Sequence, residues 1–99
     1  INMRSMFLGS KASILDLSSF DTSKVTNMSN MFLSSLNLEK IYVSDKFVTT
    51  AVKSSANMFN DVPKLVGGSG TTYDKANVDK TYARIDGGTS SPGYFTLKQ

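Results

Sequence analysis

The chain has 99 residues, enough for one domain, and its 39% hydrophobic and 19% charged fractions are those of an ordinary globular protein. Its 11 basic and 8 acidic residues give a net charge of +3, but the basic residues are spread almost evenly, which is typical of a solvated surface and not of a nucleic-acid partner. The sequence contains no cysteine, which excludes disulfides and thiolate metal sites, and no apolar run approaches the ~18 residues of a membrane span.

An internal repeat runs through the first two thirds of the chain. A Met-Phe pair occurs three times, and successive pairs are 25 and then 27 residues apart. Upstream of the last two pairs, Phe, Val and Met recur at offsets of 0, 5 and 11 residues. The sequence begins INMRSMF, within this pattern, so we expect it to be cut from a longer protein. The repeated residues are Met6-Phe7, Met31-Phe32 and Met58-Phe59 for the pairs, and Phe20, Val25 and Met31, then Phe47, Val52 and Met58, for the longer block.

Each repeat is predicted to contain one short strand and one short helix. Alternating apolar residues predict parallel strands at 15–18 and 41–44, and a third strand follows Pro63 at 64–66. Apolar residues at helical spacing predict two-turn helices that end near Phe7, Phe32 and Phe59. One unit cannot bury its own apolar face, so this stripe is predicted to be core and not a cofactor or partner groove. The predicted core is Leu15, Leu17, Phe20, Val25, Met28, Phe32, Ile41, Val43, Phe47, Val52 and Phe59.

The repeat period predicts the fold class. A unit of 25 to 27 residues with one strand lies within the leucine-rich-repeat range of about 20–29 residues. We therefore predict an α/β-type repeat solenoid, a leucine-rich-repeat-like stack of short parallel strands and short helices with a Gly-rich C-terminal cap. Residues 1–66 form two to three repeats, and 67–99 form the capping segment. Met3, Met6 and Phe7 should lack half of their packing, which invites self-association through the first repeat.

The composition changes at Gly67, because six of the seven glycines lie between there and residue 93. Paired glycines at 67–68 and 87–88 predict tight turns, and Pro92-Gly93 predicts a turn into a strand at 94–98. After Asp79, a short helix through residue 85 and a strand over 81–85 both remain open. We interpret the segment as a cap, because the last unit of a solenoid otherwise exposes unpaired strand groups. Phosphate binding is disfavoured, since GGSGT lacks the Lys and the helix start of a P-loop.

Several stretches resemble a known family. LDLSSFDTSKVTNMSNMF and the following LSSLNLEKIYVS closely resemble the BspA-like leucine-rich repeats of bacterial surface proteins, which are related to repeats of mycoplasma-type lipoproteins. The segment with LVGGSGTTY, TYARIDGG and PGYFT resembles the terminal unit that often follows such repeats. The resemblance implies a bacterial cell-surface or secreted protein with adhesive repeats. Family members commonly carry Cys three residues after the Met-Phe pair, where this chain has Ser10, Ser35 and Val62, and we expect another small side chain to serve there.

The residue types that usually carry catalysis are missing. The chain has no His and no Cys, so the commonest general base and the most reactive nucleophile are both absent. Asp16 and Asp21 share one repeat, but Tyr42 and Val48 occupy the matching places in the next. The acidic residues nowhere follow the calcium-loop pattern. We therefore predict that the protein is not an enzyme and has no cofactor or metal.

Two functional classes remain open from the sequence. In the first, the chain is part of an adhesin that binds a host or neighbouring-cell protein or glycan. In the second, it is a passive structural spacer and end cap, which a uniformly polar surface would favour. A solenoid presents its sheet as an extended surface, and a Tyr is a natural anchor on such a surface, so outward strand positions are the first candidates for binding. They are Asp16, Ser18, Tyr42 and Ser44; the cap offers Tyr73, Arg84 and Tyr94 as a second surface, and no small-molecule pocket is expected.

Overall fold

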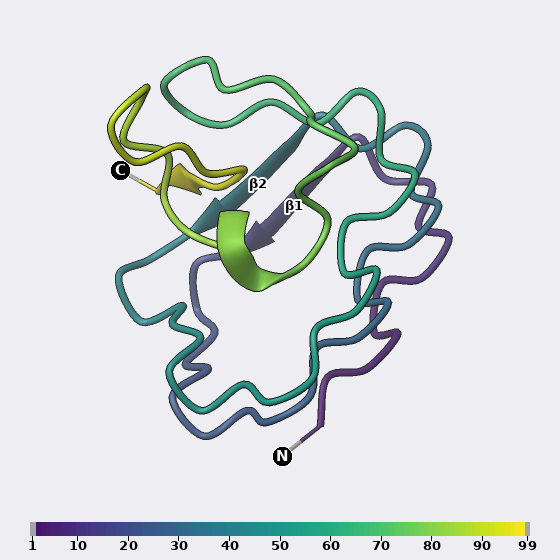
Figure 1. Ribbon diagram of the computed structural model, residues 1–99, viewed down its shortest axis with the longest axis vertical. Coiled ribbons are helices and arrows are strands. Elements are labelled where there is room, and N and C mark those ends of the chain that lie inside the picture. The colour runs from purple at the N-terminus through teal and green to yellow at the C-terminus, as the bar shows by residue number, and fades with distance from the viewer. Residues whose placement is uncertain (1, 99) are drawn as a thin grey trace.

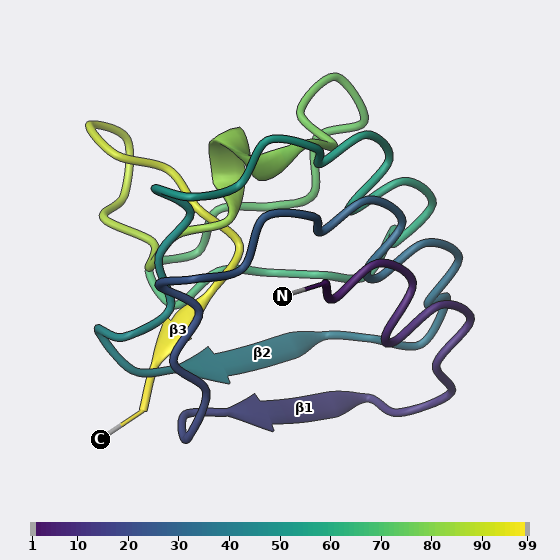
Figure 2. The same ribbon diagram turned by 90° about the horizontal axis from the view of Figure 1, so that it is seen from below.

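The computed structural model describes residues 2–98. Three strands form one parallel sheet in the order β1-β2-β3, with bounds Ile14–Leu17 for β1, Lys40–Val43 for β2 and Thr96–Leu97 for β3 (Figures 1 and 2). A 3-10 helix, η1 at Lys80–Tyr82, is the one helix among the described residues. The parallel pairing of the first two strands, predicted from the sequence, is confirmed.

The two repeat strands alternate between core and surface, as their period-2 pattern predicts. Leu17 pairs with Val43 in the register of β1 and β2, and both side chains point into the core. Asp16 pairs with Tyr42 on the opposite face. Leu15 is only half-buried, because β1 is an edge strand and has a neighbour on one side only.

The third place in the sheet differs from the prediction. No strand forms at 64–66; the Val66 amide donates to the Glu39 carbonyl at 3.0 Å, and the chain then turns away at Gly67. Instead, the C-terminal strand β3 lies beside the end of β2 and pairs with Tyr42 and Val43. Gly67 can make this departure because it packs against the Gly93 carbonyl oxygen, at a position where a Cβ atom would overlap it. The third strand therefore comes from the cap and not from the third repeat.

The predicted helices near Phe7, Phe32 and Phe59 are wrong, because these segments form successive β-turns. In the second repeat, for example, the Met31 amide donates to the Met28 carbonyl at 3.2 Å, the three-residue separation of a turn. The backbone is left-handed at every fourth residue, which no α-helix tolerates. These positions recur at the repeat spacing, with φ of 58°, 58° and 57° at Ser5, Asn30 and Asn57, and 64°, 60° and 63° at Gly9, Ser34 and Asp61.

Hydrogen bonds between neighbouring repeats replace those of the expected helices. Amides at alternate positions of one repeat donate to carbonyls of the next, for example Phe7 to Met31 and Phe32 to Met58, both at 2.9 Å. Isolated parallel bridges link residues 2, 27 and 54, which are 25 and 27 residues apart. The amides at the intermediate positions close the β-turns, so the first two segments pair most of their backbone donors without forming a helix. The repeated segments therefore lie side by side, as Figure 2 shows.

Two buried hydroxyl groups add further bonds between repeats. The Thr22 hydroxyl donates to the Val48 carbonyl and accepts from the Val48 amide, both at 2.7 Å. Ser35 is completely buried, and its hydroxyl donates to the Phe7 carbonyl at 3.1 Å. Ser35 stands at one of the positions where a small side chain was expected, and the hydrogen bond satisfies its polar atom inside the core.

A row of aromatic rings forms the centre of the core. Phe32 stacks on Phe7 at 5.7 Å between ring centroids and on Phe59 at 5.3 Å, with interplanar angles of 5° and 11°. Tyr94 and Phe95 from the cap meet Phe59 edge-on, at 72° and 63°, and so end the row. Most of the predicted core is confirmed as buried, and Leu15 and Phe20 are half-buried. The fully confirmed residues are Leu17, Val25, Met28, Phe32, Ile41, Val43, Phe47, Val52 and Phe59.

Candidate functional site

The outer face of the sheet brings together three of the predicted strand residues. Asp16 on β1 and Tyr42 on β2 are register partners, and Thr96 on β3 follows Tyr42 in the same row. Ser18 lies just past the end of β1, where its amide donates to Asp16 Oδ1 at 3.0 Å. Asp16 is exposed, whereas Tyr42 and Ser18 are half-buried. These residues define the strand face.

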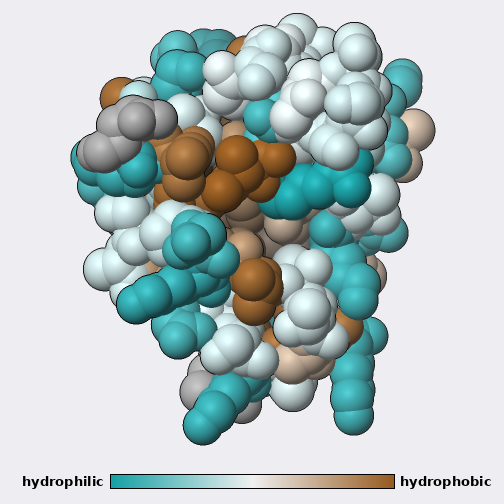
Figure 3. Space-filling model, turned by 90° about the vertical axis from the view of Figure 1, so that its left-hand side faces the viewer, coloured by the Kyte–Doolittle hydropathy of each residue, from teal (hydrophilic) through white to brown (hydrophobic). Residues whose placement is uncertain are grey.

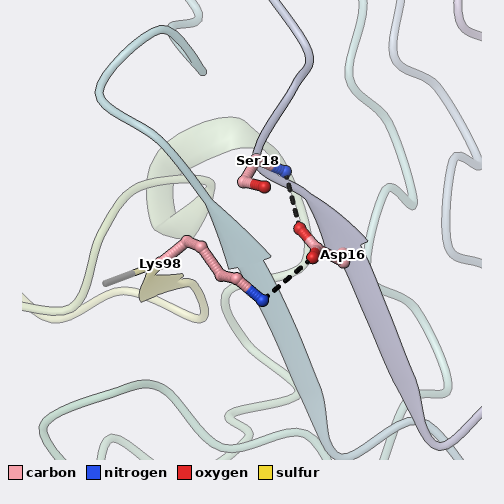
Figure 4. A network of polar contacts seen from close by, with 3 residues as sticks. All are labelled: Asp16, Ser18 and Lys98. Carbon is pink, nitrogen blue, oxygen red and sulfur yellow. Dashed lines mark hydrogen bonds and ion pairs between the residues drawn. The ribbon is translucent and has the colours of Figure 1, made fainter.

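Lys98 crosses the strand face from the end of β3 to β1. Its Nζ atom lies 3.1 Å from Asp16 Oδ2 (Figure 4). The same Nζ atom lies 5.3 Å from the centroid of the Tyr42 ring. Both charged side chains are about half exposed, so water screens their attraction and the pair adds little stability. The pair places the Lys98 ammonium group near the ring of Tyr42.

The ionised form of the Asp16 side chain is strongly favoured on this face. Hydrogen bonding by Ser18 and then by Lys98 lowers the pKa of Asp16 from 3.8 to about 2. Asp16 is therefore a carboxylate at any physiological pH, and the strand face offers a fixed anion and a fixed cation beside a phenol ring. Ser44 does not join this group, since its hydroxyl accepts from the Lys46 amide at 3.1 Å in the turn after β2.

The second predicted surface, in the cap, is only partly a surface. Tyr94 is completely buried, so its prediction as a surface contact is wrong. Its hydroxyl lies 3.0 Å from the Asp74 carbonyl and 2.9 Å from that of Asn77, and burial raises its pKa to about 12. The Tyr94 ring instead packs against two other rings, with centroid distances of 5.8 Å to Tyr73 and 5.0 Å to Tyr82. Arg84 is exposed, and its Nε atom donates to the Pro92 carbonyl at 2.7 Å.

An open cleft lies on the cap, contrary to the expectation that no small-molecule pocket exists. Its volume is about 830 Å³. It is lined by the loop at 69–75, by Tyr82, by the turns at 88–89 and 92, and by Pro63. Tyr73 is half-buried in its wall, and its hydroxyl accepts from the Asp61 amide at 3.0 Å. The cap therefore has a concave surface that the sequence did not reveal.

The buried carboxylate of Asp86 holds the glycine-rich loops of the cap. It accepts hydrogen bonds from five groups, at 2.7–3.4 Å. Burial favours the neutral acid, but the bonds from Thr71, Gly88 and Ser69 outweigh it and lower the pKa to about 2. Two of the five amides of GGSGT, those of Ser69 and Thr71, are thus already occupied by an internal anion. The five donors are the amides of Ser69, Thr71, Gly88 and Gly93 and the hydroxyl of Thr71.

Residues 2–98 contain no group of three acidic side chains placed to hold a metal ion. Among the same residues, no helix has the length and apolar character of a membrane span.

Sequence reasoning missed two components of these sites. Lys98 was assigned to a C-terminal strand, but nothing in the sequence placed that strand beside β2. The role of Asp86 was not predicted, although the glycine pairs at 67–68 and 87–88 are a signal for backbone amides that gather on an anion.

The structure defines a class, a single parallel sheet with side-by-side repeats and a C-terminal cap. The family model described as "Mycoplasma protein of unknown function, DUF285" matches residues 1–91, so the chain belongs to this family. No curated protein shows a significant match to the chain, and no solved structure does.

Proposed function

We propose that the chain is the C-terminal end of a leucine-rich-repeat-like solenoid in a BspA-like bacterial surface protein. In this proposal it is not an enzyme, and its strand face binds a protein or glycan of a host or neighbouring cell. The observation that carries the proposal is the strand face itself, on which Asp16, Tyr42 and Lys98 lie next to one another. Membership of a Mycoplasma family is consistent with a bacterial surface protein.

The repeat spacing supports the solenoid part of the proposal. Hydrogen bonds recur between segments 25 and 27 residues apart, and the cap residues Tyr94 and Phe95 meet the last ring of the stack edge-on. The first and second repeats each donate alternate amides toward the following repeat, and the Phe59 amide of the third donates to the Val78 carbonyl of the cap. A stack built in this direction grows by adding units before the first repeat, and the cap ends it on the other side.

The strand face has the side chains of a recognition surface. A tyrosine gives a large contact area at a low cost in conformational entropy, and the adjacent charges give orientation. The surface is also not uniformly polar, since Figure 3 shows a face on which hydrophobic side chains form a patch among hydrophilic ones. Large hydrophobic side chains exposed among the described residues are Met6, Leu8, Ile14, Leu36 and Leu97.

A binding assay with variants of the strand face tests the proposal. Immobilised matrix proteins and host-cell glycoproteins are probed with the wild type, Tyr42→Ala and Asp16→Ala, and with Lys53→Ala as a matched exposed control. We expect both strand-face variants to weaken binding to the partner that the wild type retains, and Lys53→Ala to bind as the wild type does. If both variants bind a confirmed partner as tightly as the wild type, the strand face is not the site.

One observation favours the alternative function, a passive spacer and end cap. Lys98 covers part of the Tyr42 ring and pairs with Asp16, so these residues already satisfy one another. If the chain binds none of the probes while a longer protein that contains it still adheres to cells, the spacer function is correct and the adhesive function of this chain is rejected.

A further inference from the structure

The cap cleft has the size of a site for one small ligand. Its volume of about 830 Å³ falls within the ~300–1,000 Å³ range of small-molecule sites in proteins. The cleft lies in the cap, and none of the strand-face residues lines it. A ligand in the cleft therefore requires no contact with Asp16 or Tyr42.

Two tyrosine rings form rigid walls of this cleft. Tyr73 and Tyr82 both line it, and each packs against the buried ring of Tyr94. Tyr94 cannot move aside, because its hydroxyl is fixed by the backbone of Asp74 and Asn77. The two outer rings are therefore held in place before a ligand arrives, which lowers the entropy cost of binding.

Hydroxyl groups without partners surround the rings. Thr72, Thr89 and Tyr82 line the cleft, and their hydroxyls form no hydrogen bond within residues 2–98. Tyr73 accepts one hydrogen bond from the Asp61 amide and keeps its own proton to donate. The cleft thus offers both donors and acceptors around apolar rings.

The loops that carry these groups are fixed from beneath. Thr71 and Ser69 donate to Asp86, as does Gly88, which also lines the cleft. One buried carboxylate therefore joins the two loops that line the cleft. A site whose loops share a buried anchor is pre-organised for its ligand.

The charges that line the cleft are balanced. Asp74 and Lys75 contribute one negative and one positive charge. The Asp74 carboxylate accepts from the Ala76 amide at 2.9 Å and from Asn77 Nδ2 at 3.0 Å, so its oxygens are partly occupied. The cleft therefore favours a ligand without net charge over a phosphorylated or acidic one.

From this arrangement we propose that the cap cleft binds a neutral saccharide. A pyranose ring has an apolar face of C–H groups that packs on an aromatic ring, and its edge carries hydroxyls that pair with the free hydroxyls of the cleft. A proline-rich peptide also packs on tyrosine rings, but its prolines offer only carbonyl acceptors, so they use the Thr72 and Thr89 hydroxyls as donors only, whereas sugar hydroxyls both donate and accept. The site is distinct from the strand face and does not depend on its binding a partner.

The test is an NMR titration of the whole 99-residue chain. The probes are maltotriose, chitotriose and lactose as neutral saccharides, 3′-sialyllactose as an acidic one, and a polyproline peptide. We expect at least one neutral saccharide, at millimolar concentrations, to shift the amide signals of Thr72, Tyr73, Tyr82 and Thr89. The proposal is overturned if no neutral saccharide shifts these signals, or if the acidic sugar or the peptide binds more tightly.

Matched variants assign the binding to the cleft. Thr72→Val and Thr89→Val keep the shape of exposed side chains, so the fold is retained, and each should weaken binding by about five-fold, the usual loss for one hydrogen bond. Tyr82→Ala should abolish saccharide binding. Tyr82→Phe keeps the ring and removes only the hydroxyl, so it distinguishes their two contributions. Tyr42→Ala on the strand face should leave the affinity unchanged. Unchanged affinity in both threonine variants, or a loss in Tyr42→Ala, would contradict the proposed site.

Discussion

At the scale of single residues, Asp86 does more for the cap than any other side chain. Its carboxylate accepts from the loop at 69–71, from Gly88 and from Gly93, and so joins three segments of the cap. The position is also sterically closed, because a Cβ atom added at Gly67 would lie 2.6 Å from Asp86 Oδ2. A charged group in this place stabilises the fold only while it stays ionised.

Stability should therefore fall in acid. The folded-state pKa of Asp86, about 2, lies below the ordinary value of an aspartate, 3.8. Its contribution is fully present above pH 3.8 and is lost as the pH falls from there toward 2. The pKa of Asp16 is lowered over the same range, but Asp16 is exposed, so salt screens its contribution to the stability. Thermal melts followed by circular dichroism between neutral pH and pH 2 should show this loss.

The variant Asp86→Asn separates the buried carboxylate from the other acids. We expect a lower melting temperature at neutral pH and a smaller further loss in acid, because Asn cannot accept all five hydrogen bonds with a negative charge. Asp45→Asn, at an exposed carboxylate, is the control and should melt as the wild type does. An Asp86→Asn protein with wild-type melting and an unchanged acid transition would show that Asp86 does not hold the cap.

The aromatic row gives a second prediction at this scale. Phe32 is stacked on both sides and fully buried, so Phe32→Ala should cost about 3–5 kcal/mol in the free energy of unfolding. Phe7 has the same place in the first repeat but is only half-buried. Phe7→Ala should therefore cost clearly less. Urea denaturation measures both values, and equal losses would contradict the position of Phe7 at the end of the row.

At the scale of elements, the β-turn segments differ most from what the sequence predicts. Met28, Phe32 and Ser35 are buried at spacings that a helix also produces. The pattern of apolar residues therefore cannot distinguish a helix from turns that repeat every four residues. The deciding feature is the left-handed backbone at Asn30 and Ser34, and neither is a glycine that would have revealed it.

Substitution of Asn30 tests the turn directly. Its φ of 58° is tolerated by asparagine but strained for alanine, so Asn30→Ala should destabilise the protein by ~1–2 kcal/mol. Asn30→Gly should be neutral or stabilising, because glycine enters this region without cost from a Cβ atom. In a helix the order would be reversed, since alanine is the best helix former and glycine among the worst. Chemical denaturation of the two variants therefore decides between a turn and a helix at this position.

The strands and the strand face were more predictable than the cap. The period-2 pattern fixes which side of β1 and β2 faces outward, so Asp16 and Tyr42 could be placed together from the sequence. Lys98 could not, because its place depends on β3 pairing with a strand more than fifty positions away in the chain. The cleft was missed for the same reason, since Tyr73 and Tyr82 meet only through the buried ring of Tyr94.

At the scale of the whole molecule, the two ends of the repeat stack differ. Met6 is 49% exposed, whereas Met31 and Met58 at the same repeat position are fully buried. The carbonyls at residues 2, 4, 6 and 8 also receive no hydrogen bond within the described chain, although those of the second repeat accept from the first. This first face is apolar and carries acceptors, so we propose that it packs against another repeat unit. The opposite end is closed by the cap.

In solution, this apolar face should promote weak self-association. Two such faces supply acceptors but no matching donors to each other, so the contact is apolar and the dimer weak. Sedimentation velocity should show a monomer–dimer equilibrium that Met6→Glu reduces. Leu97→Glu is the control, because Leu97 is 42% exposed on β3 at the other edge of the sheet. A clean monomer at high concentration, or equal effects of both variants, would argue against the first face as the contact.

The central claim, that hydrogen-bonded stacking of 25- to 27-residue repeats builds this molecule, is tested most directly by NMR couplings across hydrogen bonds. Such a coupling identifies the carbonyl to which each amide donates. The structure predicts couplings from the Phe7 nitrogen to the Met31 carbonyl carbon and from the Phe32 nitrogen to the Met58 carbonyl carbon. A coupling from Phe32 to the Met28 carbonyl carbon, the pairing of an α-helix, would contradict the account.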